Sequence, residues 1–521
     1  MTRLRPPDLI SFEVVRHPAG RVLLGLLSGL ALAFAFPSHH VPLLAWLSVA
    51  ALMVASLGAR PRRAALCGFL HGAVFYTATL PWISTVMRVH GGLPVAPAAG
   101  VLVLIVAAAS LFTATFALLI SWLGRSSVTH ACLAAPFLWV VLEFGRTHLP
   151  HIGFPWNLLG YAASSNLALL QLAPLTGIYG LSFLIAGYNS LFAWAIKGSS
   201  GFRDRRAAVW LAVTLALVLV AQFGGRFVPA EAPRRVARLL QTNFPQSPSY
   251  PADWMDRHAP ELDELERLSN VARERGAELV IWPETPAPFS MQDPKFAQRA
   301  ERIARASGSA FLLGVVDWKP GPHGGLAPYN SAALLDAAGR RTFHYDKIHL
   351  VPFGEYVPLR RWLRFARSLT AEVGGFQAGS EYKVGELPGG KFGVFICYEA
   401  IFPAEVRRFV VGGAELLVNI SNDGWFGRSA APEQHLAMAR VRAVENRRWL
   451  LRATNNGYTV AVDPYGRYAA RLEPDLRGAL EAPYDFRSDL TLYACWGDWL
   501  AWLCLVVTAY WLGVTILRGA R

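Results

Sequence analysis

Three side chains that can carry out acyl-transfer chemistry lie at the ends of predicted strands. Glu284 follows the apolar run Leu279–Trp282, Cys397 follows the run Phe392–Ile396, and Lys347 lies at the end of a third strand. Short apolar runs flanked by turn residues are typical of buried strands in an α/β domain. Catalytic groups usually sit where such strands end in irregular loops. The pattern therefore predicts one site with a carboxylate, an ammonium and a thiol.

The thiol of Cys397 is the candidate nucleophile of this site. A free thiol has a pKa of about 8.5 and is mostly protonated at neutral pH. A nearby ammonium favours the thiolate, and a carboxylate that accepts the proton as general base typically contributes about 10²–10⁴-fold in rate. The ammonium and the backbone N–H groups after the cysteine then face the oxyanion that forms when a carbonyl is attacked. The residues alone equally allow Cys397 to pair with His344 or His349.

The other cysteines do not compete for this role. Four of the five lie in apolar stretches, where cysteine behaves as a small hydrophobic residue, namely Cys67, Cys132, Cys495 and Cys504. Cys397 has no second cysteine in its own domain with which to form a disulfide or a zinc site. The histidines of that domain are scattered, so we expect no metal and no cofactor.

Residues 226–492 read as a soluble catalytic domain in which strand and helix patterns alternate. This alternation predicts an α/β or layered α+β domain. Further elements expected there are a helix around Leu262–Val271, strands at Phe311–Val316, Ser331–Leu335 and Leu416–Ile420, a turn at Asp336–Arg340, and a helix after Pro403.

The segments on either side of this domain are apolar and predict membrane-spanning helices. The chain is 53% hydrophobic and only 17% charged, below the ~25% charged fraction of ordinary soluble proteins. Since a span needs about 20 apolar residues, we expect about seven helices in residues 1–225 and a closing helix in residues 493–521. The candidate spans are Val22–Phe36, Val41–Leu57, Ala64–Met87, Leu93–Leu123, Ala131–Phe144, Leu167–Ile196, Ala207–Phe223 and Tyr493–Leu517. Further spans follow the first at once, so we interpret it as a retained helix and not as a cleaved signal peptide.

The basic residues predict a membrane topology, and no nucleic-acid partner is expected. The net charge is +14, but many arginines lie in short loops between apolar runs, with no RNA- or DNA-binding motif around them. They gather before the first span, between spans two and three, between spans six and seven, and at the end of the chain. By the positive-inside rule both termini are cytoplasmic, and residues 226–492 lie on the outer side. The aromatic loop His148–Asn166 faces that side too, either as an interfacial belt or as a lipid-entry wall beneath the site.

The motifs around the three reactive residues resemble those of the nitrilase superfamily. They are Trp-Pro-Glu-Thr at 282–285, Tyr-Asp-Lys-Ile-His-Leu-Val-Pro-Phe-Gly-Glu-Tyr at 345–356, and Ile-Cys-Tyr-Glu at 396–399. The resemblance implies a Glu–Lys–Cys triad on an α-β-β-α sandwich. With Gln-Thr-Asn-Phe-Pro-Gln at 241–246, Asn-Asp-Gly-Trp-Phe-Gly at 422–427 and the membrane spans, nearly the whole chain resembles the apolipoprotein N-acyltransferase family. The expected fold is a multi-span α-helical membrane domain plus an α/β nitrilase-like domain.

The resemblance also implies a role for each matching residue. Cys397 would be the nucleophile, Glu284 the general base and Lys347 the electrostatic partner. Glu355 matches a second acidic residue that supports the nitrilase site, and Tyr398 and Glu399 match the two positions after the family's cysteine.

Aromatic residues are the candidate substrate contacts. Tyr250 stands where the family usually presents a tryptophan, with Trp254 nearby. Trp425 and Phe426, with Trp282, are expected to limit the access of water to an acyl-enzyme, or else to be core or membrane-interface residues. The segment Val357–Phe376 alternates arginine with aromatic and apolar residues, which suits an amphipathic lid on anionic headgroups or a basic surface helix.

The reaction implied by the family is a two-step acyl transfer at the bacterial inner membrane, with the catalytic domain in the periplasm. A phospholipid would give its acyl chain to Cys397 as a thioester. The thioester would then acylate the N-terminal amine of a diacylglyceryl-cysteine in an apolipoprotein, the last step of lipoprotein maturation. The competing interpretation is a membrane-anchored nitrilase-type amidase that hydrolyses small amides with the same triad, with water as the acceptor.

Overall fold

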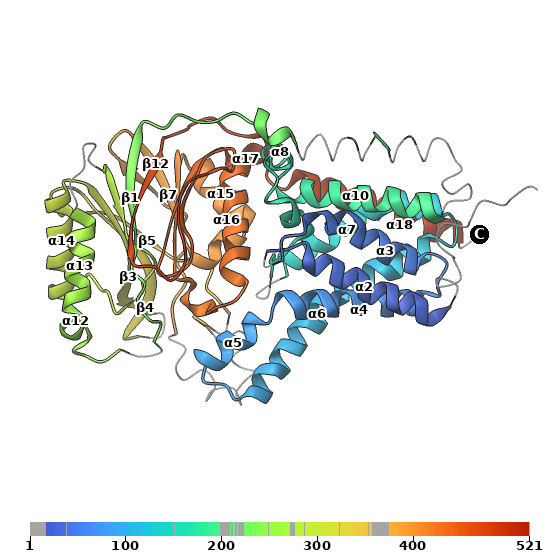
Figure 1. Cartoon of the computed structure of the whole chain (residues 1–521), viewed down its shortest axis with the longest axis horizontal. Helices are drawn as coiled ribbons and strands as arrows, with labels where there is room; N and C mark the ends of the chain where they lie inside the picture. Colours follow the sequence, from blue (N-terminus) through green and yellow to red (C-terminus); the bar gives the residue numbers. More distant parts are fainter. Residues whose placement is uncertain are drawn as a thin grey trace, which may run out of the picture.

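The computed structural model describes residues 17–519 except 38, 150–152, 198–222 (of which only 209, 212, 213 and 216 are described), 248–249, 271–276, 286, 322–323, 353 and 357–374. The described residues form a helical part beside a two-sheet sandwich (Figure 1). The predicted span Ala207–Phe223 and the predicted lid Val357–Phe376 lie mostly outside the described residues.

The helical part contains most of the apolar segments predicted as spans. Its helices are α2 (Pro18–Phe34), α3 (Ala45–Ser56), α4 (Pro61–Thr79), α5 (Trp82–Val89), α6 (Val95–Leu123), α7 (Val128–Thr147), α8 (Leu167–Leu170), α9 (Ala173–Thr176), α10 (Ile178–Lys197), α17 (Leu492–Trp496) and α18 (Trp499–Gly519). Within the described residues, four helices (α6, α7, α10 and α18) are long and apolar enough to cross a membrane, or five if α4 and α5 count as one bent span. The prediction of a multi-helix membrane part is confirmed.

Several predicted spans are shorter or more broken than expected. The predicted span Ala64–Met87 folds as α4 and α5, which meet at an angle of 51°. Pro81 causes the break, because proline has no N–H to donate and disfavours a helical conformation in the preceding residue. In the predicted span Leu167–Ile196, Gly177 adopts a φ of +65°, so a continuous helix begins only at Ile178. Helices α2 and α3 have 17 and 12 residues, fewer than the roughly 20 that an upright span needs.

Small residues let three of these helices pack closely. A Cβ atom added at Gly29 of α2 would lie 2.3 Å from the carbonyl oxygen of His71 in α4. One added at Gly68 of α4 would lie 2.3 Å from the carbonyl oxygen of Thr113 in α6. Helices that associate in lipid use such small residues to bring their backbones together. Helix α4 is therefore the centre of a tightly packed three-helix layer.

The sandwich is built from two six-stranded sheets. The first has the order β12-β1-β2-β3-β4-β5 and the second the order β11-β10-β9-β8-β7-β6. Their bounds are β1 Arg235–Gln241, β2 Leu279–Ile281, β3 Ala310–Pro320, β4 Leu326–Leu335, β5 Arg341–Asp346, β6 Val384–Leu387, β7 Gly390–Ile396, β8 Leu416–Ser421, β9 Trp449–Thr454, β10 Thr459–Val462, β11 Tyr468–Leu472 and β12 Gly478–Tyr484. In each sheet three neighbouring strands are parallel, namely β1, β2 and β3 in the first and β7, β8 and β9 in the second.

Helices cover the outer face of each sheet, which completes an α-β-β-α sandwich (Figure 1). The outer layers are α12 (Trp254–Arg257), α13 (Ala259–Asn270) and α14 (Pro294–Ser307) on the first sheet, and α15 (Pro403–Val411) and α16 (Ala431–Asn446) on the second. Helix α14 shows how the sequence sets these elements: Asp293 caps its first turn by accepting from the N–H of Lys295 at 2.8 Å, and Gly308 ends it at a φ of +63°. The predicted fold class is confirmed.

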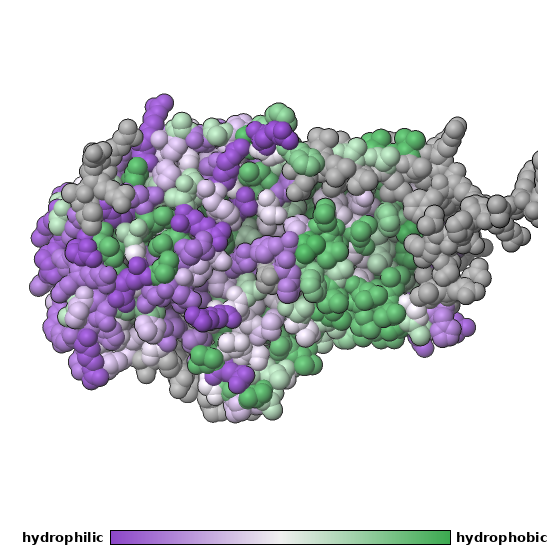
Figure 2. Space-filling model, viewed as in Figure 1, coloured by the Kyte–Doolittle hydropathy of each residue, from purple (hydrophilic) through white to green (hydrophobic). Residues whose placement is uncertain are grey.

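The surface differs sharply between the two parts (Figure 2). Hydrophilic residues cover the sandwich, whereas hydrophobic ones gather over the helical part. Exposed apolar side chains of α6 and α18 include Val103, Leu104, Val506 and Tyr510. A surface of this kind is stable in lipid and not in water.

Candidate active site

The ends of three strands bring together the reactive side chains named from the sequence. Glu284 lies just beyond β2, Lys347 directly after β5, and Cys397 directly after β7. All three are buried, with exposed fractions of 4%, 1% and 5%. Since β2 and β5 belong to one sheet and β7 to the other, the site spans the interior of the sandwich.

Lys347 is held by two carboxylates. Its Nζ donates to Oε1 of Glu355 at 2.9 Å and to Oε1 of Glu284 at 3.2 Å. The amide nitrogen Nδ2 of Asn330 donates to the same two oxygens, at 2.7 Å each. Burial acts to lower the pKa of Lys347, but the charges of Glu284 and Glu355 outweigh it and raise that pKa, so the ammonium persists at neutral pH.

Glu355 and Glu284 differ in what their second oxygens do. Oε2 of Glu355 accepts from the N–H of Val351 at 2.8 Å, which fixes the loop after Lys347. Oε2 of Glu284 accepts from the N–H of Asn422 at 2.8 Å. Both oxygens of Glu355 are therefore engaged within its own loop and with Lys347 and Asn330, an arrangement suited to holding the lysine.

Cys397 begins a tight turn in a conformation that is uncommon for a side-chain-bearing residue. It is the first residue of the 3-10 helix η6 (Cys397–Ile401) and has a φ of +50°. Such left-handed positions cost about 1–3 kcal/mol and cluster at functional sites.

Burial raises the pKa of the Cys397 thiol well above its usual range, and the nearby Glu284 adds to this, although Lys347 acts in the opposite direction. Lys347 acts toward the thiolate, as expected, but desolvation outweighs it, so the thiol needs a base to accept its proton.

Glu399 ties the cysteine strand to the lysine loop. Its Oε2 accepts from the N–H of Ile396 at 2.6 Å, just before the cysteine. Its Oε1 accepts from the N–H groups of Ile348 and His349 and from the hydroxyl of Tyr345. Burial raises the pKa of Glu399 to about 7. This carboxyl, named from the sequence only as a neighbour of the cysteine, sets the distance between the strands that carry Lys347 and Cys397.

The histidines considered as alternative partners of the thiol have other contacts. His344 Nε2 lies 2.7 Å from Oδ1 of Asp346 and 2.7 Å from Nζ of Lys319. His349 Nδ1 lies 2.8 Å from Oε1 of Glu405, and its ring stacks on Phe402. These contacts favour the Glu–Lys–Cys arrangement over a Cys/His pair.

The predicted aromatic residues occupy different environments. Trp282 is fully buried among the side chains under α13 and α14 and donates to Oγ of Ser269, so it is a core residue and not a water barrier at the thiol. Tyr250 is half-buried, with its ring 6.0 Å from Trp254. Trp425 is half-exposed against His90, whereas Phe426 is buried. Tyr398 is buried too, and its ring packs against Phe402.

Two groups of buried polar residues near the triad were missed by sequence reasoning. One is Asn330, which bridges the two carboxylates. The other is a set of fully buried residues behind Cys397, in which Arg452 pairs with Asp423 at 2.8 Å and His435 reaches the cysteine's carbonyl oxygen. A buried Asn, Asp or Arg looks like a surface residue in a sequence, so only the Asn-Asp-Gly motif at 422–424 gave any signal.

Helix α16 joins the sandwich to the helical part. Its Gln434 accepts from Nε1 of Trp156 at 2.7 Å, and its Glu445 accepts from the N–H of Ile178, the first residue of α10, at 2.9 Å. Trp156 and Tyr161 were expected in an interfacial belt or an entry wall, yet their exposed fractions are 0% and 1%. The loop that carries them is buried between the two parts of the chain: the ring of Trp156 packs against Trp82 of α5 and His435 of α16, and the hydroxyl of Tyr161 accepts from Arg442 of α16.

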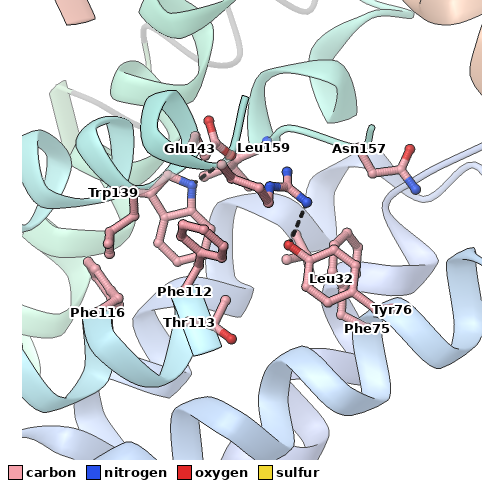
Figure 3. Close-up of a pocket in the computed structure, with 12 residues that line it drawn as sticks. Leu32, Phe75, Tyr76, Phe112, Thr113, Phe116, Trp139, Glu143, Asn157 and Leu159 are labelled. Atoms are coloured by element: carbon pink, nitrogen blue, oxygen red, sulfur yellow. Dashed lines mark hydrogen bonds between the residues drawn. The ribbon is translucent and has the colours of Figure 1, made fainter. Parts of the chain in front are cut away.

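A crevice in the helical part lies among α2, α4, α6 and α7 (Figure 3). Glu143 at its edge accepts from Nε1 of Trp139 and from the N–H of Leu159, and Nη1 of Arg146 donates to the hydroxyl of Tyr76 at 2.8 Å. None of the residues that line it belongs to the Glu–Lys–Cys group. Among the described residues no group of three or more His, Cys, Asp or Glu is arranged to hold a metal ion.

Two family models match the two parts of the chain, and the one that matches the sandwich is that of the carbon-nitrogen hydrolases. Residues 244–487 match the family model described as "Carbon-nitrogen hydrolase", and residues 28–191 match the one described as "Apolipoprotein N-acyltransferase N-terminal domain". Among solved structures, a mutant of the Nesterenkonia AN1 amidase from the nitrilase superfamily is 24% identical, with a TM-score of 0.37, over 50% of this chain and 94% of that chain.

Curated relatives narrow the assignment. An apolipoprotein N-acyltransferase of Geobacter metallireducens is 37% identical over 97% of this chain and 96% of its own length. One of Methylococcus capsulatus is 36% identical over 92% of this chain and 93% of its own length, and one of Azotobacter vinelandii is 34% identical over 95% of each. The chain belongs to the apolipoprotein N-acyltransferase family.

Proposed function

We propose that this enzyme takes an acyl chain from a membrane phospholipid onto Cys397 and passes it to the N-terminal amine of a diacylated apolipoprotein. The observation that carries the proposal is the similarity to named apolipoprotein N-acyltransferases over nearly the whole chain, helical part included. The buried group of Glu284, Lys347 and Cys397 supports the chemistry.

The first step is attack by the Cys397 thiol on an ester carbonyl of the phospholipid. Because the thiol is protonated at rest, Glu284 accepts its proton as the sulfur–carbon bond forms. The ammonium of Lys347 and the backbone N–H groups after the cysteine stabilise the oxyanion. The carbon–oxygen bond then breaks, Glu284 returns the proton to the departing oxygen, and a lysophospholipid leaves a thioester on Cys397.

The second step reverses these roles with an amine as the acceptor. The α-amine of a diacylglyceryl-cysteine attacks the thioester carbonyl, and Glu284 accepts a proton from its nitrogen. The carbon–sulfur bond breaks, and the proton returns to the sulfur to restore the thiol. Nothing else is consumed, so the cycle is ping-pong, with one acyl chain carried from an ester to an amide.

The membrane setting follows from the same proposal. Residues 1–225 and 493–521 would lie in the inner membrane, with both termini cytoplasmic and residues 226–492 periplasmic. Both substrates are then anchored in the leaflet beside the catalytic domain, which lowers the entropic cost of bringing them together. Trp425, Phe426 and Tyr250 would contact the substrates and limit the access of water to the thioester.

The proposal is tested by intact mass measurement and peptide mapping of detergent-purified protein after incubation with phospholipid. Cys397→Ala is the inactive comparison. Cys132→Ala is the matched control, because Cys132 is also a buried free cysteine but lies in α7. We expect an acyl adduct on Cys397 that hydroxylamine removes, unchanged in the control and absent from Cys397→Ala. Turnover of small amides without any adduct from phospholipid would favour the amidase function instead.

A further inference from the structure

His435 lies directly behind the nucleophile. It comes from α16, is fully buried, and its Nε2 lies 3.0 Å from the carbonyl oxygen of Cys397. Its Nδ1 lies 3.1 Å from Nη2 of Arg452 and 3.1 Å from Oδ1 of Asp423. The mechanism above uses none of these three residues.

The contacts of His435 fix the role of its Nε2. A carbonyl oxygen can only accept, so Nε2 must donate to Cys397. Nδ1 faces Nη2 of Arg452 and Oδ1 of Asp423, at 3.1 Å each. Asp423 also holds the guanidinium of Arg452 through both carboxylate oxygens, at 3.0 and 2.8 Å. The imidazole is thus held in one orientation, with Nε2 directed at the carbonyl oxygen of Cys397.

The hydrogen bond from His435 fixes the peptide group that joins Cys397 to Tyr398. That peptide is trans, and in a trans peptide the N–H points away from the C=O. With the carbonyl turned toward His435, the N–H of Tyr398 points to the opposite side. Tyr398 is the second residue of the turn η6, a position whose N–H has no partner within the helix. Its N–H is therefore free of the turn and is the first backbone donor after the nucleophile.

We propose that His435 is a positioning residue that orients the Cys397–Tyr398 peptide, so that the Tyr398 N–H faces the oxyanion of each acyl-transfer step. This inference rests on the proposed function of Cys397 as the acylated nucleophile. It assigns Arg452 and Asp423 the task of holding the imidazole. It also explains how the unfavourable φ of +50° at Cys397 is maintained.

The same histidine links the nucleophile to the helical part of the chain. The ring of Trp156 lies over that of His435, with centroids 5.9 Å apart and planes 29° apart, and Phe426 packs at its edge, 5.8 Å away. Trp156 follows α7 and is anchored by its bond to Gln434. The packing of the sandwich against the helical part therefore contributes to the orientation of the Tyr398 N–H.

The test compares two reactions of Cys397 in the purified full chain. Acylation by p-nitrophenyl butyrate passes through an oxyanion, whereas alkylation by iodoacetamide does not. Removal of an oxyanion donor typically costs about 10²–10³-fold, so we expect His435→Leu to slow acylation by about 10²-fold while alkylation changes little. His435→Gln keeps a hydrogen-bond donor, so its acylation rate should lie between those of His435→Leu and the wild type. Trp156→Leu should shift the ratio in the same direction.

The matched control is His71→Leu, which removes another fully buried imidazole, from α4. It should leave the ratio of the two rates unchanged. If both rates fall together in His435→Leu, or if acylation is unaffected, the inference is wrong. If His435→Leu does not fold, the comparison of His435→Gln with the wild type decides. The two proposals can fail separately. If phospholipid does not acylate the wild type, the proposed function is wrong. The nitrophenyl ester still tests the orientation of the Cys397–Tyr398 peptide, because it acylates Cys397 without a phospholipid.

Discussion

Replacement of Glu355 by glutamine isolates the part that the second carboxylate plays in the site. Glu355 accepts from Lys347 and Asn330 through one oxygen and from the N–H of Val351 through the other. Glutamine has the same shape but only one acceptor oxygen. In Glu355→Gln an N–H₂ group must therefore face either the Val351 N–H or the ammonium of Lys347.

The expected loss of acylation rate in Glu355→Gln follows from the distance between Lys347 and Glu355. A full charge pair at the 2.9 Å separation of Lys347 and Glu355 is worth about 6 kcal/mol at an effective dielectric constant of about 20. Glu284 still pairs with the lysine at 3.2 Å, so only part of this is lost. Removal of one partner from a buried ion pair typically costs about 3–5 kcal/mol. If about 3–4 kcal/mol of that loss appears in the transition state, the acylation rate falls by about 10²–10³-fold.

The assay is single-turnover acylation of Cys397, followed by intact mass, at several pH values. Glu381→Gln serves as the control, because Glu381 is an exposed carboxylate whose partner Lys383 is 3.5 Å away on the surface. We expect a slower Glu355→Gln enzyme with the same pH profile, since Glu355 holds Lys347 and does not transfer protons. A rate close to that of the control, or the loss of one limb of the pH profile, would refute this assignment.

Three further predictions concern the Cys397 thiol, the Glu399 carboxyl and the packing of helices α2 and α4. Burial raises the pKa of the Cys397 thiol, so iodoacetamide should react with it more slowly at pH 7.5 than with free cysteine and faster as the pH rises; fast alkylation that levels off below pH 7 would contradict this. Burial raises the pKa of Glu399 from 4.5 to about 7, so the folded state binds its proton more tightly than the unfolded state, and stability should fall by about 3 kcal/mol as the pH rises from 4.5 to 7. The unfolding midpoint in detergent should show this slope, and Glu399→Gln should lose it. Gly29→Val should lower the unfolding midpoint, because an added Cβ would lie 2.3 Å from a backbone oxygen and overpacking of this kind costs about 1–3 kcal/mol of stability. Gly100→Val, which has open space around the glycine, should leave the midpoint unchanged. Equal effects of the two variants would argue against close packing of α2 and α4.

The sequence predicts well what depends on local pattern. The runs before Glu284 and Cys397 are apolar and short, and they fold as the buried strands β2 and β7. The turn at Asp336–Arg340 is confirmed by the N–H of Gly339 donating to the carbonyl of Asp336 at 2.8 Å. Hydropathy likewise located the helical part, because apolar length does not depend on tertiary contacts.

What the sequence did not predict depends on burial and on contacts between distant segments. The rise in the pKa of the Cys397 thiol above that of a free thiol arises from desolvation, which outweighs the effect of the neighbouring lysine. The side chain of Asn330 acts on partners 25 and 46 residues away along the chain, and that of His435 on one 38 residues away. Nothing in the local sequence of either residue marks it as buried. The aromatic loop at 148–166 suits a membrane interface by composition, yet Trp156 is buried because α16 supplies an acceptor for its indole.

The most direct test of the central claim is a chase of isolated acyl-enzyme. Protein acylated with a labelled phospholipid is freed of lipid and then mixed with a synthetic diacylated lipopeptide that has a free N-terminal amine. We predict that the label leaves Cys397 at the rate at which an N-acyl amide appears on the lipopeptide, with one label transferred per enzyme. Label that remains on Cys397 in the presence of the amine, or that is released as free fatty acid at the same rate with or without the lipopeptide, would contradict acyl transfer through this cysteine.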